Sequence, residues 1–123
     1  MKIRVLIVDD EFTLAETVAE MLTERGYETV VAINGRLGLE RLRTDGARLV
    51  MMDVMMPIMD GPTLLREMRR DPDLRDIPVV MMTAVPEALP SDEPPLHQGT
   101  LVKPFSPDAM FRMVERLTNG EPS

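Results

Sequence analysis

Short apolar runs alternate with segments of helical periodicity along this chain. Five of the runs are continuous rather than alternating, and they cover residues 5–8, 30–33, 49–52, 79–82 and 101–102. A continuous apolar run of this length is typical of a strand that is buried on both faces, as in a parallel sheet. The pattern therefore predicts five strands whose two faces are covered by other elements.

The segments between and after these runs carry apolar residues three or four positions apart, which is the period of an amphipathic helix. Four such segments have apolar faces within residues 14–22, 37–42, 64–68 and 110–117. The first three helices are predicted to end at Gly26, near Gly46 and before Pro72. The last is predicted to begin at Ser106 as its N-cap, with Pro107 in the first helical position.

Strands and helices thus follow one another in the order expected of an open, doubly wound α/β sheet with helices on both sides. The length of 123 residues suits one domain, which we assign to residues 1–120, with 121–123 as a tail. Residues 86–98 are an exception to the pattern, because four prolines stand where a full helix is expected. Proline removes a backbone donor and clashes with the preceding turn, so this segment is predicted to form at most a turn or two of helix.

Composition narrows the class of protein. The chain has no cysteine, which excludes a disulfide framework and a thiolate metal site. Its net charge of −7 argues against direct binding to nucleic acid or to an anionic membrane. No apolar run approaches the roughly 20 residues of a membrane span, and the apolar stretch near the N-terminus is too short for a signal peptide. We therefore expect a soluble cytoplasmic protein.

Specific polar residues follow four of the five predicted strands. They are Asp9 and Asp10 after the first strand, Asp53 after the third, Thr83 after the fourth and Lys103 after the fifth. In open α/β sheets, ligands bind beyond the carboxyl ends of the strands, so these residues are expected to gather at one edge although they are distant in sequence.

The chemistry of this group points to phosphoryl transfer. Three carboxylates and one lysine sum to −2, and such a cluster either raises the pKa of a carboxyl or takes up a cation. Oxygen ligands without soft donors suit Mg²⁺. Carboxylates are competent nucleophiles for aspartyl-phosphate formation. Lys103 and the Thr83 hydroxyl are groups that can hold phosphoryl oxygens.

These residues stand in four segments that together resemble the receiver domains of two-component response regulators. The segments are 8–11 (VDDE), 52–61 (MDVMMPIMDG), 82–84 (MTA) and 102–105 (VKPF). The resemblance covers nearly the whole chain. It implies a flavodoxin-like sheet of five parallel strands in the order 2-1-3-4-5, in which the family's fourth helix is degenerate here.

The resemblance also implies roles for individual residues. Asp53 would be the phosphoacceptor. Mg²⁺ would be held by Asp10, Asp53 and the backbone carbonyl of Met55, with Asp9 acting through water. Thr83, Ala84 and Lys103 would bind the phosphoryl group, and Thr83 would move toward it as the switch. All of these residues lie within the four segments that carry the resemblance.

A receiver domain of this kind implies a sensor histidine kinase or a phosphotransfer protein as phosphoryl donor, and a downstream protein as a further partner. It would accept a phosphoryl group and catalyse its own phosphorylation and dephosphorylation without being an enzyme in the usual sense. Two departures affect the output face. The family has an aromatic residue three positions before the lysine, where this chain has Thr100, and residues 86–98 replace a helix.

Three other functions are less consistent with these residues. A phosphatase of the haloacid-dehalogenase type needs a second Asp two residues after its nucleophile, where this chain has Met55. A receiver fold that acts by protein contact without phosphorylation is the alternative that residues 86–100 favour. Methionines near 51–59 are interpreted as core fillers rather than a copper site. His97, the only histidine, is interpreted as a solvated loop residue.

Overall fold

The computed structural model describes residues 2–119, and the predicted tail at 121–123 lies outside this range. Five parallel strands form one sheet: β1 (Arg4–Val8), β2 (Glu28–Ala32), β3 (Leu49–Asp53), β4 (Val79–Thr83) and β5 (Gly99–Val102). Their order in the sheet is β2-β1-β3-β4-β5. The flavodoxin-like architecture predicted from the sequence is therefore confirmed.

The expectation that all five strands are buried on both faces is wrong for the two outer ones. The strands β1, β3 and β4 are almost entirely buried, whereas β2 and β5 are half-buried along much of their length. A strand at the edge of a sheet has a neighbouring strand on one side only, so part of its apolar run remains accessible to solvent. At the end of β2, Ile33 lies outside the strand and is 46% exposed.

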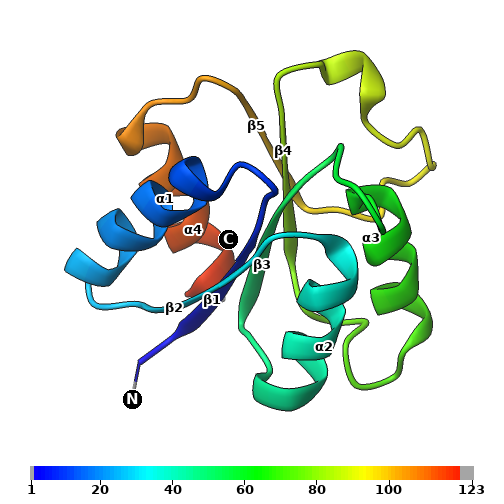
Figure 1. The fold of residues 1–123 in the computed structure, drawn as a ribbon, viewed down its shortest axis with the longest axis horizontal. Helices are drawn as coiled ribbons and strands as arrows, with labels where there is room; N and C mark the ends of the chain where they lie inside the picture. Colours follow the sequence, from blue (N-terminus) through cyan, green and yellow to red (C-terminus); the bar gives the residue numbers. More distant parts are fainter. Residues whose placement is uncertain (1, 120–123) are drawn as a thin grey trace.

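Four helices lie on the two faces of the sheet (Figure 1). They are α1 (Phe12–Glu24), α2 (Gly35–Asp45), α3 (Gly61–Arg70) and α4 (Pro107–Thr118). The predicted start of the last helix is confirmed, because the Ser106 hydroxyl oxygen accepts a hydrogen bond from the backbone N–H of Ala109 at 3.0 Å. Asn34 and Asp60 cap α2 and α3 in the same way.

The alternation of side chains along the strands divides the core in two. On β1, Leu6 and Val8 point to the face covered by α2 and α3, while Val5 and Ile7 point to the face covered by α1 and α4. Figure 1 shows these two helical layers on opposite sides of the sheet. Within residues 2–119, none of the helices has the length and apolar character needed to cross a membrane.

The β4–β5 segment, residues 84–98, contains one turn of 3₁₀-helix at Pro86–Ala88 and otherwise runs without regular structure. The prediction of at most a turn or two of helix is confirmed. Ala88, Leu89 and Leu96 nevertheless pack against the core on the α3 side of the sheet. The segment therefore covers part of this face of the sheet through a few apolar contacts instead of through a helix.

Candidate functional site

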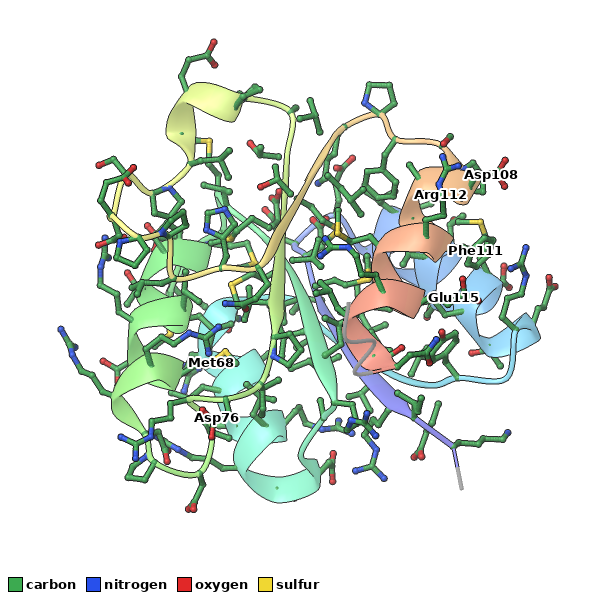
Figure 2. The ribbon with its side chains drawn as sticks, turned by 180° about the vertical axis from the view of Figure 1, so that it is seen from behind. Met68, Asp76, Asp108, Phe111, Arg112 and Glu115 are labelled. Carbon is green, nitrogen blue, oxygen red and sulfur yellow. The ribbon has the colours of Figure 1, made fainter. Side chains whose placement is uncertain are left out.

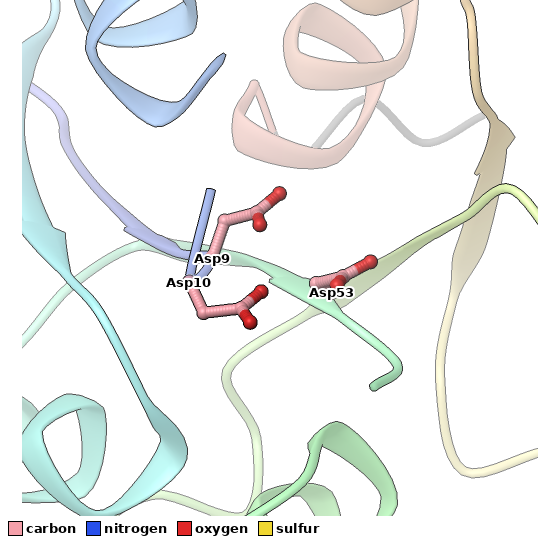
Figure 3. A group of neighbouring side chains, drawn as sticks. All are labelled: Asp9, Asp10 and Asp53. Carbon is pink, nitrogen blue, oxygen red and sulfur yellow. The ribbon is translucent and has the colours of Figure 1, made fainter. Parts of the chain in front are cut away.

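Asp9 and Asp10 stand at the carboxyl end of β1, and Asp53 is the last residue of the adjacent strand β3 (Figure 3). Their carboxylate groups come together there, with one oxygen from each residue within 4.8 Å of the other two. Asp9 is fully buried and Asp10 is exposed. The expected convergence of three carboxylates at one edge of the sheet is thus observed.

Lys103 brings a positive charge into this cluster from the end of β5. Its Nζ lies 2.9 Å from Asp9 Oδ2 and 3.2 Å from Asp53 Oδ1. The backbone N–H of Lys103 donates to the carbonyl oxygen of Thr83, at 2.8 Å, which continues the pairing of β5 with β4. The side chain is only 13% exposed, so its charge is weakly screened by solvent.

The pKa of Asp53 is raised above its usual value. Burial is the largest cause, the negative charge of Asp9 adds to it, and the charge and hydrogen bond of Lys103 oppose it. For Lys103, burial by itself lowers the pKa, but the hydrogen bonds and charges of Asp9 and Asp53 outweigh burial and raise it. Lys103 is therefore held as a cation, and the negative charge around Asp53 exceeds what one lysine neutralises.

Thr83 ends β4 and is 2% exposed. Its hydroxyl donates to the carbonyl oxygen of Val85 at 3.0 Å and accepts from the Val85 N–H at 2.9 Å. The hydroxyl thus holds the start of the β4–β5 segment in this structure. Sequence reasoning singled out Thr83 but not its partner, because nothing in the sequence marks Val85.

The loop after β3 is held tightly against the sheet. The backbone N–H of Gly61 donates to the Val54 carbonyl at 3.0 Å, and Val54 N–H donates to the Met82 carbonyl at 3.1 Å. A Cβ at Gly61 would collide with the backbone carbonyl of Asp53, so only glycine fits this approach. Met55, two residues after Asp53 in this loop, is 62% exposed.

The residues present fit a hard divalent cation. The donors are carboxylate oxygens. Burial is the main cause of the raised pKa of Asp53, and the negative charges of Asp9 and Asp10 add to it. Met51 and Met52 are fully buried on opposite faces of the sheet, Met56 and Met59 are partly buried against the core, and Met55 is exposed. Their interpretation as core fillers is supported for Met51 and Met52.

Two features of the site were not found by sequence reasoning. Glu11 Oε1 lies 3.7 Å from Lys103 Nζ, and the Glu11 N–H donates to Asp9 Oδ1 at 2.9 Å. The position of Glu11 next to Asp10 in the sequence was the signal that could have revealed this contact. The second feature is a set of exposed apolar side chains at the same edge of the sheet, which we call the apolar collar: Phe12, Ile33, Met55, Ile58 and Val85.

His97 does not lie where the sequence suggested. It is half-buried, and its Nδ1 is buried without a hydrogen-bond partner among the described residues. The interpretation as a solvated loop residue is therefore wrong. Its neighbour Leu96 packs against the core, and the Leu96 carbonyl accepts a hydrogen bond from Arg69.

Comparisons with known proteins agree with this geometry. The family model described as response regulator receiver domain matches residues 5–115. A relative named probable transcriptional regulator ycf27, from Porphyra purpurea, is 37% identical over an alignment of 121 residues that covers 94% of this chain and 48% of that protein. The chain thus spans about half the length of this curated relative.

Solved structures show the same fold. A putative response regulator from Chloroflexus aurantiacus aligns with a TM-score of 0.89 and 28% identity, over 97% of this chain and 99% of the other. The receiver domain of the sensor histidine kinase PA1611 from Pseudomonas aeruginosa aligns with a TM-score of 0.83 and 24% identity, over 97% and 99%. The second structure has a magnesium ion coordinated in its active-site cleft.

The chain belongs to the response regulator receiver domain family, because the family model covers most of its length. It is a receiver module of two-component signalling. None of the comparisons favours the alternative of a receiver fold that acts without phosphorylation.

Proposed function

We propose that this chain is a switch that accepts a phosphoryl group on Asp53 in a Mg²⁺-dependent reaction. The observation that carries the proposal is that the Asp53 carboxylate lies within 4.8 Å of carboxylate oxygens of Asp9 and Asp10 and 3.2 Å from the ammonium group of Lys103. A carboxylate that adjoins both cation-binding carboxylates and a lysine has the surroundings that phosphoryl transfer needs, namely positioning and charge neutralisation.

The reaction makes one bond and breaks one. A carboxylate oxygen of Asp53 attacks the phosphorus atom of the donor, and an O–P bond forms while the bond from phosphorus to the donor breaks. That bond is P–N in a phosphohistidine and P–O in acetyl phosphate. Water later cleaves the aspartyl phosphate, which releases inorganic phosphate and restores the carboxylate.

The residues around Asp53 have separate tasks. Asp10, Asp53 and the Met55 carbonyl would hold Mg²⁺, with Asp9 acting through water, and the cation would supply positive charge to the phosphoryl oxygens. Lys103 would pair with the phosphoryl group. Thr83 and Ala84 contact its oxygens, and Thr83 must then exchange its hydrogen bonds with Val85 for one to the phosphoryl group.

Intact-mass measurement after treatment with acetyl phosphate and Mg²⁺ tests the proposal. We expect wild type to gain the mass of one phosphoryl group and Asp53→Asn to gain none. Asp108→Asn is a matched control, because Asp108 is an exposed carboxylate on α4 (Figure 2). Equal labelling of wild type and Asp53→Asn would refute the assignment of Asp53, and labelling that is unchanged by a chelator would refute the role of Mg²⁺.

The apolar collar supports a protein as the phosphoryl donor, of the sensor histidine kinase or phosphotransfer class. All five of its side chains lie on segments that follow the carboxyl ends of strands, so they surround the acidic site with apolar surface. Exposed apolar residues gathered around a polar centre are typical of a protein contact site.

Transfer from a protein phosphohistidine should therefore depend on the collar, and transfer from acetyl phosphate should not. Phe12→Ser and Ile58→Ser are expected to slow the first reaction and leave the second unchanged. Thr44→Ser is the control, because Thr44 is exposed near the end of α2, away from the carboxyl ends of the strands. Equal slowing by all three variants would show that the collar has no specific part in binding the donor.

A further inference from the structure

The end of the β4–β5 segment is fastened to α3 by one arginine. The Arg69 guanidinium donates to the Leu96 carbonyl and to the Gln98 side-chain oxygen, each at 3.0 Å. It also donates to the carbonyls of Arg75 and Ile77, both at 3.0 Å. A single planar group thereby joins the segment to the turn before β4.

Gln98 extends this attachment into the sheet. Its side-chain oxygen accepts from the Val79 N–H at 2.8 Å, and its own backbone N–H donates to the Val79 carbonyl at 2.9 Å. The residues on both sides of His97 are thus bonded to Arg69, and the imidazole is confined between two fixed points.

The surroundings of the His97 imidazole disfavour its protonated form. Its Nδ1 is buried, and no group among the described residues donates to it or accepts from it. A proton on this atom would need an acceptor that the docked segment does not provide, and it would add a second positive charge beside Arg69.

The charged groups around the imidazole come from three elements. Burial is the largest cause of the lowered pKa of His97, and the positive charge of Arg69 on α3 adds to it. Asp92, within the segment itself, acts in the opposite direction. Asp76, in the turn before β4, acts on Arg69, whose own pKa is lowered mainly by burial. The balance favours the neutral imidazole.

We propose that His97 is a proton-operated release for the β4–β5 segment: the segment is docked on α3 while the imidazole is neutral, and protonation detaches its end around residues 96–98. The proposal does not depend on phosphorylation of Asp53. The sheet stays folded when the segment detaches, because backbone hydrogen bonds between its strands hold it together.

The direction of the response follows from linkage. A docked state that lowers the pKa of His97 binds fewer protons than the detached state, so acid shifts the equilibrium toward detachment. Each pKa unit between the two states weakens docking by roughly tenfold once both are protonated. The response lies below the ordinary histidine pKa of about 6.5.

Amide hydrogen exchange of the whole chain tests this, after correction for the intrinsic effect of pH, at about pH 8 and at about pH 5, on either side of the ordinary histidine pKa. We expect the protection of residues 88–98 to fall in acid in wild type and to stay constant in His97→Gln. Amides of β1 and β3 are the internal control and should keep their protection. Loss of protection in both proteins alike, or in neither, would overturn the proposal.

A second measurement needs no variant. His97 is the only histidine, so its imidazole signals in an NMR titration are unambiguous. The midpoint of its titration should lie below the ordinary value and should coincide with the midpoint of the loss of protection. A titration at the ordinary histidine pKa, or a loss of protection at a different pH, would overturn the proposal even if His97→Gln fails to fold.

Discussion

The side-chain hydroxyl of Thr83 makes two hydrogen bonds to the backbone of Val85, one as donor and one as acceptor, at 3.0 and 2.9 Å. A residue at the end of a buried strand is thereby tied to the first residues of the β4–β5 segment. Movement of the hydroxyl toward a phosphoryl group on Asp53 would break at least the bond that it donates, because one hydroxyl has one proton to donate. We therefore expect the state of the site and the position of the segment to be coupled.

Replacement of Thr83 by valine should loosen this attachment. The substitution keeps the volume of the side chain and leaves the Val85 N–H without its acceptor, which costs about 1–2 kcal/mol in the free energy of unfolding. Amide exchange at Val85 should also become faster. Thr83→Ser keeps the hydroxyl and is the control, so urea denaturation that places both variants at the same stability would contradict this reading.

Removal of the Lys103 charge should destabilise the chain strongly when no divalent cation is present. Lys103→Met leaves the fully buried carboxylate of Asp9 without its 2.9 Å partner. Breaking a buried ion pair in this way costs about 3–5 kcal/mol. Added Mg²⁺ should restore part of the loss, since it supplies positive charge at the same carboxylates.

The chain offers a close control for this experiment, because its only other lysine, Lys2, is exposed. Lys2→Met should change the free energy of unfolding by no more than about 0.5 kcal/mol, as is usual for exposed positions. If both variants are equally stable with and without Mg²⁺, the Lys103 ion pairs contribute nothing to the fold.

Arg69→Met should weaken the docking of the β4–β5 segment at any pH. The guanidinium donates to four acceptors, and its loss is expected to cost about 2–4 kcal/mol. Arg69→Lys should recover little of this, because an ammonium group lacks the planar fork that reaches several acceptors. Arg66→Met on the same helix is the control, since Arg66 is exposed; thermal unfolding at the same temperature for all three variants would refute the role of Arg69.

Gly61→Ala should damage the site and not only the fold. The added methyl group meets the backbone carbonyl of Asp53 and, at 3.1 Å, the Cα of Val54, neither of which can rotate away. We expect a loss of about 1–3 kcal/mol, as for other overpacked positions, together with slower labelling by acetyl phosphate. Thr63→Ala, an exposed position in the same turn, should label at the wild-type rate, and a normal rate in Gly61→Ala would show that the loop adapts.

The stability of the chain should also depend on pH through His97. The pKa of this residue is lowered in the folded state, so the unfolded chain binds more protons as the pH falls below about 6.5. The contribution of His97 to stability is complete above this pH and is lost as the pH falls through the folded pKa. Urea denaturation across this range should show the stability of wild type falling relative to His97→Gln, and parallel curves would contradict the linkage.

The sequence alone was enough to predict the fold and the gathering of Asp9, Asp10, Asp53 and Lys103 at one edge of the sheet. Continuous apolar runs separated by helical periodicity lead to a parallel sheet with two helical layers, because each pattern shows which faces of its strand or helix are apolar and must be covered. The positions of Asp9, Asp53 and Lys103 at strand ends were enough to predict that they meet, because parallel strands present their carboxyl ends at one edge. Proline chemistry also predicted the missing helix between β4 and β5.

Tertiary structure decided what depends on contacts between distant segments. Lys103 is placed between Asp9 and Asp53 by the order of the strands and the direction of its side chain, neither of which has a local signature. The same holds for the Thr83 hydroxyl, which bonds to Val85 rather than to the site. The partial burial of His97 was not predicted, because the surrounding prolines indicate an exposed loop. In the structure, the neighbouring Leu96 packs against the core and its carbonyl accepts a hydrogen bond from Arg69. Local patterns specify the elements, but the charge, solvation and partners of each side chain depend on which segments pack around it.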